Sequence, residues 1–174
     1  SIGISFAIAW FLVAKEVPAE QDVKRNALTA CQYLPLAQLN DGVFSKKMVG
    51  DGYAMQSDDG VVFAPVTGRI STIFPTKHAI GITTADGIEV LVHMGLDTVD
   101  LAGKPFEVLV KVGDQVTPHT QIAQMDLKAI AAAGKDSTIV VVVTNMDKIK
   151  ALQQQFTSTH ALHGGQPVAT VELH

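Results

Sequence analysis

Short apolar runs separated by turn residues are the feature that most limits how this chain can fold. Beyond residue 26 the runs are rich in Val, Ile, Thr and Phe, and Gly, Pro, Asp or Asn interrupts them. Interruptions about every 8–12 residues are typical of a β-sandwich or barrel. We expect strands at residues 31–34, 52–56, 60–63, 68–74, 78–84, 88–94, 106–110, 121–126, 139–144 and 168–172. The chain is therefore predicted to be all-β, a compact antiparallel β-sandwich or barrel with one or two short helices.

Two segments have helical character within this β pattern. Asp126 can cap the run LKAIAAA, which ends at Gly134, so this pair provides a start and a stop. A second helix is expected over residues 145–156, with Asn145 as its capping residue.

The beginning of the chain differs in composition from the rest. Residues 1–14, SIGISFAIAWFLVA, are largely apolar but shorter than the roughly 20 residues that span a bilayer. We interpret them as the end of a transmembrane helix, although a run of this length is also consistent with a buried segment. Residues 15–25 are charged and contain a proline, as in a linker. The globular domain is then expected to occupy residues 26–174.

Composition and motifs exclude several classes of function. The formal net charge is -4 and no cluster of Lys and Arg is present, so nucleic-acid binding has no support. Cys31 is the single cysteine, which excludes an intrachain disulfide, and we expect it to be a small buried residue. The chain has no phosphate-binding P-loop, no dinucleotide fingerprint, no H-E-x-x-H zinc motif and no G-x-S-x-G nucleophile elbow.

Two histidines fall on one predicted β-hairpin. An Asp-Gly pair at residues 86–87 favours a two-residue turn, because Gly tolerates the positive φ of such turns. In that register Ile80 faces His93, and His78 lies diagonally from His93 on the same face, with backbones about 7–8 Å apart. A three-residue loop would shift the register by one and place the two rings on opposite faces.

Paired histidines suit nucleophilic chemistry. Neutral imidazole, the dominant form at pH 7, can form a covalent intermediate. Gly95 lets the chain bend after His93, so that a local carbonyl can accept one ring N–H and fix the tautomer. His78 and the hydroxyl of Thr76 could then donate hydrogen bonds to a phosphoryl group. The same two histidines could be satisfied core residues or could bind zinc, although catalytic zinc usually has three protein ligands.

A family resemblance selects among these interpretations. Between about residues 28 and 147 the chain contains, in order, NDGVFSKKMVGDGYAM, VVFAPVTGRISTIF, TKHAIGI, GIEVLVHMGLDTVDLAGKPFE, VKVGDQV and VTNMD. With these pieces it resembles the glucose-family IIA domain of the bacterial phosphoenolpyruvate:sugar phosphotransferase system. The resemblance implies a β-sandwich with a shallow apolar active-site face and a transferase that requires no cofactor. It implies that His93 is the phosphorylated nucleophile and His78 its helper, and that Thr76, Gly95 and Asp97 occupy supporting positions.

The resemblance also implies partners. The histidine-containing phosphocarrier protein would phosphorylate His93, and a cysteine of a IIB domain would take the group for sugar phosphorylation during uptake. The apolar start fits members in which IIA is the C-terminal part of a permease, fused behind a membrane IIC domain. The pattern near residues 28–44 is most similar to β-glucoside-type members. A cytoplasmic domain tethered to the inner face of the cell membrane is then expected. The candidates for an apolar docking rim are Val43, Phe44, Phe74, Ile80 and Val99.

Three alternatives stay open. A zinc-dependent peptidase on a related β scaffold would need a further ligand, typically as H-x-H, but position 95 is Gly. A biotinyl- or lipoyl-like carrier would need a modified lysine at a hairpin tip, whereas Lys128 lies at a predicted helix start. A regulatory binding module could use the same face as the transferase.

Overall fold

The chain folds into antiparallel β-sheets, as its pattern of short apolar runs predicts. The computed structural model describes residues 5–9, 31–162 and 167–174. The strands are β1 (Ser5–Ala9), β2 (Cys31–Pro35), β3 (Asp51–Ser57), β4 (Val61–Phe63), β5 (Gly68–Ile73), β6 (Ala79–Thr83), β7 (Glu89–Leu96), β8 (Phe106–Val108), β9 (Gln115–Val116), β10 (Gln121–Met125), β11 (Asp136–Val143), β12 (Ile149–Gln154), β13 (His160–Leu162) and β14 (Pro167–Leu173). The helical elements are η1 (Leu36–Gln38), η2 (Thr98–Leu101), α2 (Leu127–Ala132) and η3 (Met146–Lys148).

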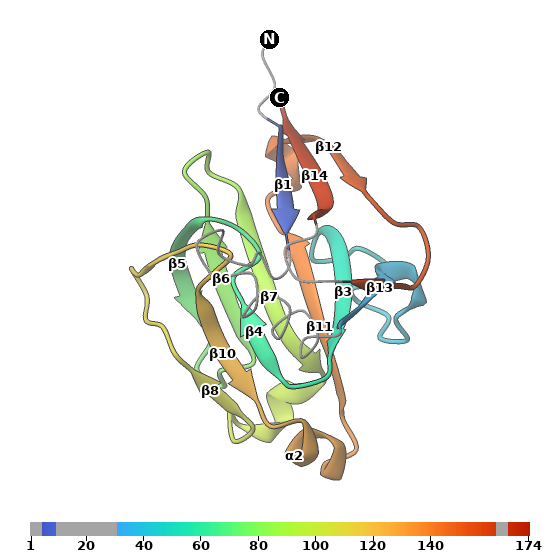
Figure 1. Cartoon of the computed structure of the whole chain (residues 1–174), viewed down its shortest axis with the longest axis vertical. Helices are drawn as coiled ribbons and strands as arrows, with labels where there is room; N and C mark the ends of the chain where they lie inside the picture. Colours follow the sequence, from blue (N-terminus) through green and yellow to red (C-terminus); the bar gives the residue numbers. More distant parts are fainter. Residues whose placement is uncertain (1–4, 10–30, 163–166) are drawn as a thin grey trace, which may run out of the picture.

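Within the described residues the strands form one large and two small sheets. The large sheet has the order β13-β2-β3-β11-β7-β6-β5-β9, and the small ones have the orders β4-β10-β8 and β1-β14-β12. Figure 1 shows β1, β12 and β14 at one end of the molecule and α2 at the other. This arrangement places β7, which carries His93, among the inner strands of the large sheet.

Strand β11 shows why these residues form the centre of the sheet. Its run of β-branched residues is buried on both sides, which is typical of a central strand. Ile139, Val141 and Val143 belong to the main core, whereas Val140 and Val142 join a smaller apolar cluster on the other face. That smaller cluster lies on the same face as His93, because Val140 is the cross-strand partner of His93.

The first predicted helix is confirmed. The side chain of Asp126 accepts a hydrogen bond from the Ala129 amide, and Gly134 follows the helix with a φ of 70°. The second predicted helix, at residues 145–156, is wrong: a short 3-10 turn at Met146–Lys148 leads into β12. Strand β12 pairs with β14, so cross-strand hydrogen bonds decide its conformation more than the capping residue does.

The apolar start of the chain also differs from expectation. Ser5–Ala9 form a strand that pairs with β14, whereas residues 1–4 and 10–30 lie outside the described residues. A short apolar run cannot by itself distinguish a strand from a helix, and pairing with β14 decides for the strand here. Among the described residues, no helix has the length and apolar character needed to cross a membrane.

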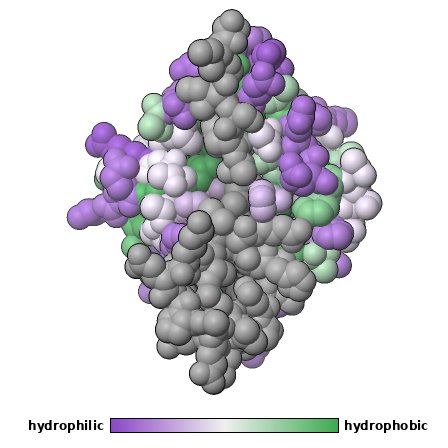
Figure 2. Space-filling view, turned by 45° about the horizontal axis from the view of Figure 1, so that its top comes forward, coloured by the Kyte–Doolittle hydropathy of each residue, from purple (hydrophilic) through white to green (hydrophobic). Residues whose placement is uncertain are grey.

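Most large apolar side chains are inside the protein. On the face in Figure 2, the visible apolar areas are small and lie among hydrophilic residues. Among the described residues, the exposed large hydrophobic side chains are Val43, Met48, Phe74, Val99, Leu109 and Val112.

The turn of the histidine hairpin has three residues instead of two. The amide of Gly87 donates to the carbonyl of Thr84, and Thr84 pairs with Ile88 across the loop. The register is therefore shifted by one from the predicted pairing, so that Ala79, not Ile80, faces His93. A loop with Gly87 at a φ of 80° accommodates Asp-Gly as readily as a two-residue turn does.

Candidate active site

His93 is held by strand pairing on both sides. It lies on β7 between Ala79 of β6 and Val140 of β11. Its Nδ1 lies 2.8 Å from the carbonyl oxygen of Gly95, which accepts a hydrogen bond from this nitrogen when it carries the proton. That tautomer is the one expected from the sequence, and in it Nε2 of the ring has no proton and a free lone pair.

Gly95 is required by geometry at this bend. Its φ is +82°, and a Cβ atom there would collide with the Thr98 side chain and approach the Asp136 carbonyl oxygen to 2.8 Å. Thr98 is fully buried, and its hydroxyl donates to the Met94 carbonyl at 2.6 Å. The close packing of Thr98 under Gly95 fixes the carbonyl that holds His93.

The rings of His78 and His93 meet, with centroids 4.8 Å apart. In the observed register, strand alternation would place the two rings on opposite faces of the sheet, as expected for a three-residue loop. The contact between the rings shows that this expectation is wrong. His78 precedes β6, and the residue before it, Lys77, has a φ of 55°. The turn is closed by hydrogen bonds from the Lys77 amide to the Phe74 carbonyl and from the Phe74 amide to the Ala79 carbonyl. Because the chain is not extended here, the alternation of a strand does not decide where the His78 ring lies.

Thr76 lies within hydrogen-bond distance of the second ring. Its Oγ1 is 2.6 Å from Nδ1 of His78. When the hydroxyl donates, His78 has its proton on Nε2 and can donate from there. The sequence expected Thr76 to face a phosphoryl group directly, and in the structure it is placed to orient His78.

Both rings are surrounded in a way that keeps them neutral. The pKa of His93 is lowered to about 4, mainly by burial and also by the nearby His78, and the Gly95 carbonyl and the charges of Asp41 and Asp97 oppose this shift. Burial also lowers the pKa of His78. Neutral imidazole therefore dominates at pH 7, which is the form that nucleophilic attack needs.

The predicted apolar rim is present only in part. Val43, Phe74 and Val99 are exposed. Phe44 is buried, but its ring contacts that of His93 with centroids 5.0 Å apart. Ile80 is fully buried in the core and is not a rim residue, because the observed register places it on the face opposite His93.

Two residues around His93, Asp41 and Thr98, were not predicted from the sequence. The carboxylate of Asp41 accepts hydrogen bonds from the amides of Phe44 and Ser45. Thr98 supports the bend at Gly95, as described above. The Asn-Asp-Gly sequence at residues 40–42 is a turn signal that could have indicated Asp41.

Two other predictions concern residues away from this pair. Burial, together with Asp58 and Asp59, raises the pKa of the Cys31 thiol to about 12, so Cys31 is an inert core residue, as expected. Lys128 lies in the helix α2. A carrier domain would need its modified lysine at the tip of a hairpin, so Lys128 does not fit that alternative.

The site is a pair of contacting histidine rings on an antiparallel β fold, and comparison with known proteins identifies the chain as a phosphotransferase-system domain. The family model for EIIA 1 of the phosphoenolpyruvate-dependent sugar phosphotransferase system matches residues 24–149. The chain belongs to this family, whose members are phosphotransferases.

Individual relatives agree with this assignment. The glucose-specific EIICBA component of Streptococcus pneumoniae is 49% identical over 82% of this chain, and the β-glucoside-specific EIIBCA component of Bacillus subtilis is 48% identical over 65%. The matched part is only 19% of the length of either relative. The glucose-specific EIIA component of Staphylococcus epidermidis is 37% identical over 80% of this chain and 82% of its own length. The solved glucose permease IIA of Mycoplasma capricolum is 34% identical, with a TM-score of 0.73 over 82% of this chain and 93% of its own.

Proposed function

We propose that this chain carries a phosphoryl group on Nε2 of His93 between two partners in sugar uptake. The observation that carries the proposal is a neutral His93 ring whose Nδ1 is engaged by the Gly95 carbonyl, next to the His78 ring. Nε2 attacks the phosphorus of a donor phosphohistidine; the new N–P bond forms as the donor N–P bond breaks, and the donor nitrogen keeps the electron pair. Transfer of this kind depends mainly on positioning and charge stabilisation.

His78 stabilises the transferring group in this proposal. With the Thr76 hydroxyl donating to its Nδ1, His78 has a proton on Nε2 to donate to a phosphoryl oxygen. Gly95 fixes the nucleophile, and Asp97, next to the bend, places a negative charge near the His93 ring.

The partners follow from the family. The histidine-containing phosphocarrier protein is the proposed donor, and a IIB-domain cysteine is the proposed acceptor, whose sulfur takes the phosphoryl group before the sugar does. The EIICBA and EIIBCA relatives support a IIB domain and a membrane IIC domain as parts of the same permease. The domain would then work at the inner face of the membrane, on glucose or a β-glucoside as in those relatives.

Zinc at His78 and His93 is a second candidate. The Nδ1 contacts of both rings leave their Nε2 atoms for a ligand. Across the described part of the chain, however, no three His, Cys, Asp or Glu side chains are grouped to hold a metal. Two ligands do not make a closed zinc site, so no step of the proposed reaction uses a metal. Among the same described residues, the zinc peptidase alternative also lacks a third ligand. A regulatory binding role on the same face is compatible with phosphotransfer.

The test is phosphorylation by the purified relay. The protein is incubated with phosphoenolpyruvate, enzyme I and the phosphocarrier protein, and intact mass is measured before acid-labile phosphate is mapped. We expect one phosphoryl group on His93 and none in His93→Gln. A folded wild-type protein that gains no mass, or a His93→Gln variant that does, would refute the proposal; zinc content and peptidase activity would be measured next.

A further inference from the structure

Phe44 reaches the His93 ring from outside the histidine hairpin. It belongs to residues 41–51, which we call the Phe44 segment. Its ring is 7% exposed and meets the His93 ring edge-on, 5.0 Å between centroids. An apolar ring in this place takes water away from one side of His93, and burial is the main cause of the low pKa of His93.

Asp41 fixes the backbone at Phe44 itself. One carboxylate oxygen accepts from the Phe44 amide at 2.6 Å and the other from the Ser45 amide at 3.0 Å. These hydrogen bonds hold the pKa of Asp41 below its usual value, against the opposing effect of burial. Asp41 is therefore charged at neutral pH, and charge-assisted hydrogen bonds of this kind are stronger than neutral ones.

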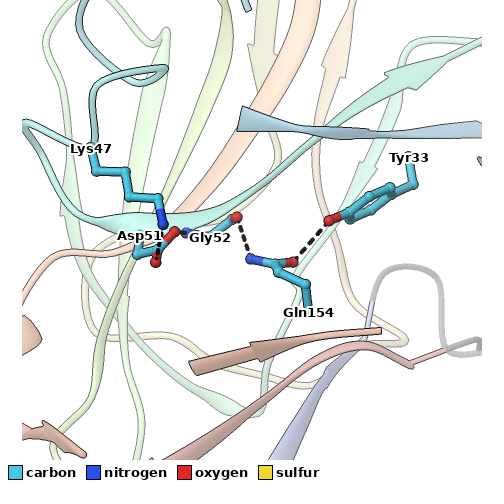
Figure 3. Close-up of polar contacts among 5 residues, drawn as sticks. All are labelled: Tyr33, Lys47, Asp51, Gly52 and Gln154. Atoms are coloured by element: carbon cyan, nitrogen blue, oxygen red, sulfur yellow. Dashed lines mark hydrogen bonds and ion pairs between the residues drawn. The ribbon is translucent and has the colours of Figure 1, made fainter. Parts of the chain in front are cut away.

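The other end of the segment is fixed independently. The Lys47 amide donates to the Phe44 carbonyl at 2.9 Å, and Lys47 Nζ pairs with Asp51 at 2.8 Å. Figure 3 shows this ion pair next to Gly52. The Gly52 carbonyl accepts a hydrogen bond from the side-chain amide of Gln154. Gln154 in turn accepts from the Tyr33 hydroxyl at 3.0 Å. With this end secured to the sheets, Asp41 is the side chain that holds the amide of Phe44.

We propose that Asp41 is a positioning residue, whose carboxylate holds Phe44 against the His93 ring and so keeps water from that side of the ring. The importance of this contact for phosphotransfer rests on the proposed function. The contact itself is tested on the isolated protein, without any relay component.

Two effects of Asp41 on His93 have opposite signs. The negative charge of Asp41, like that of Asp97, raises the pKa of His93. Holding Phe44 in place lowers that pKa by desolvation. The remaining influences are His78, which lowers the pKa, and the Gly95 carbonyl, which raises it. Removing Asp41 therefore lowers the pKa of His93 if Asp41 acts only as a charge, and raises it if Asp41 acts through Phe44.

The experiment is the titration of the His93 ring by ¹⁵N NMR in wild type and in four variants: Asp41→Ala, Asp41→Asn, Phe44→Ala and Asp41→Ala with Phe44→Ala. We expect Asp41→Ala and Phe44→Ala each to raise the pKa by about half a unit or more, since a ring exposed to water returns toward 6.5. The double variant should lie at or slightly below Phe44→Ala, because the desolvation by Phe44 is already lost and only the charge of Asp41 remains to be removed. Asp41→Asn keeps one hydrogen-bond acceptor oxygen but loses the charge, so the pKa of His93 in this variant should fall slightly.

A matched control is Asp126→Ala, which removes a carboxylate that accepts a backbone amide at the start of α2. We expect this variant to leave the His93 titration unchanged. A His93 pKa in Asp41→Ala at or below that of wild type would overturn the proposal, as would shifts in the double variant that simply add.

If Asp41→Ala does not fold, hydrogen exchange in the wild-type protein provides a second test. The amides of Phe44 and Ser45 should be protected, and exchange as fast as in an unfolded peptide would overturn the proposal. Failure of the proposed function would give a different result. The His93 titrations would be as expected, but the wild-type protein would accept no phosphoryl group.

Discussion

The two histidines reach one site from differently built regions. His93 lies on an inner strand with paired neighbours on both sides, and its bend at Gly95 is packed on Thr98. His78 comes just before β6, after a residue with positive φ. Sheet pairing therefore fixes the proposed nucleophile, whereas a tight turn fixes its proposed helper. Changes to the two regions should therefore have different consequences.

The largest expected effect is on the His93 region, from Gly95→Ala. The added Cβ collides with Thr98 and leaves Ala at a φ of +82°. Strained backbone and overpacking together should cost about 3 kcal/mol of unfolding free energy. Urea denaturation measures this loss, and phosphoryl acceptance should fall with it, because the carbonyl that orients His93 moves.

Gly134→Ala is the matched control for Gly95→Ala. Gly134 also has a positive φ, of +70°, but a Cβ there has no atom within 4 Å. Gly134→Ala should therefore lower the free energy of unfolding only by the strain of a positive φ at Ala, about 1 kcal/mol. Equal losses in the two variants would mean that packing on Thr98 does not hold the bend.

The next effect is a dependence of stability on pH. The folded protein keeps His93 neutral down to about pH 4, whereas a histidine in the unfolded chain takes up a proton near pH 6.5. Stability is therefore complete above about pH 6.5 and is lost as the pH falls toward 4, by up to about 3 kcal/mol. The lowered pKa of His78 acts in the same direction. Urea midpoints between pH 4 and 7 should show a smaller loss in His93→Gln, and an unchanged loss would show that His93 does not cause it.

The His78 region should affect rate more than stability. We expect His78→Gln to fold normally and to transfer phosphoryl groups about a hundredfold more slowly, the lower end of what a positioned proton donor contributes. Single-turnover transfer from the phosphocarrier protein, followed by rapid quench, measures the rate. A rate equal to that of wild type would remove His78 from the mechanism.

The sequence predicted the sheet region better than the turn region. Short apolar runs between turn residues located ten strands within a few residues, and the helix capped by Asp126 was also found. Strands β1, β9, β12 and β13 were missed. Pairing with β14, β5 or β2 creates them, and local patterns alone do not predict such pairing. The roles of His93 and His78 came from the family resemblance, and residue types alone left a core or zinc interpretation open.

The hairpin shows how a correct pairing was predicted for a wrong reason. The expected two-residue turn put both rings on one face, but the loop has three residues and the register is shifted. The rings still meet because the chain leaves the extended conformation at Lys77. A positive φ at a lysine has no sequence signal, since Gly, Asn and Asp are the residues that favour it.

The smallest expected effect tests that turn directly. Lys77→Val places a β-branched residue at a φ of 55°, which should cost about 1–2 kcal/mol of unfolding free energy. Lys77→Asn is the matched variant, because Asn tolerates this conformation and should cost much less. Since the turn places His78, the Val variant should also slow phosphoryl transfer and weaken the ring contact, seen as a changed His78 titration by NMR. A destabilised Val variant with wild-type transfer and an unchanged His78 titration would show that the turn does not position the ring, and that β6 alone holds His78 beside His93.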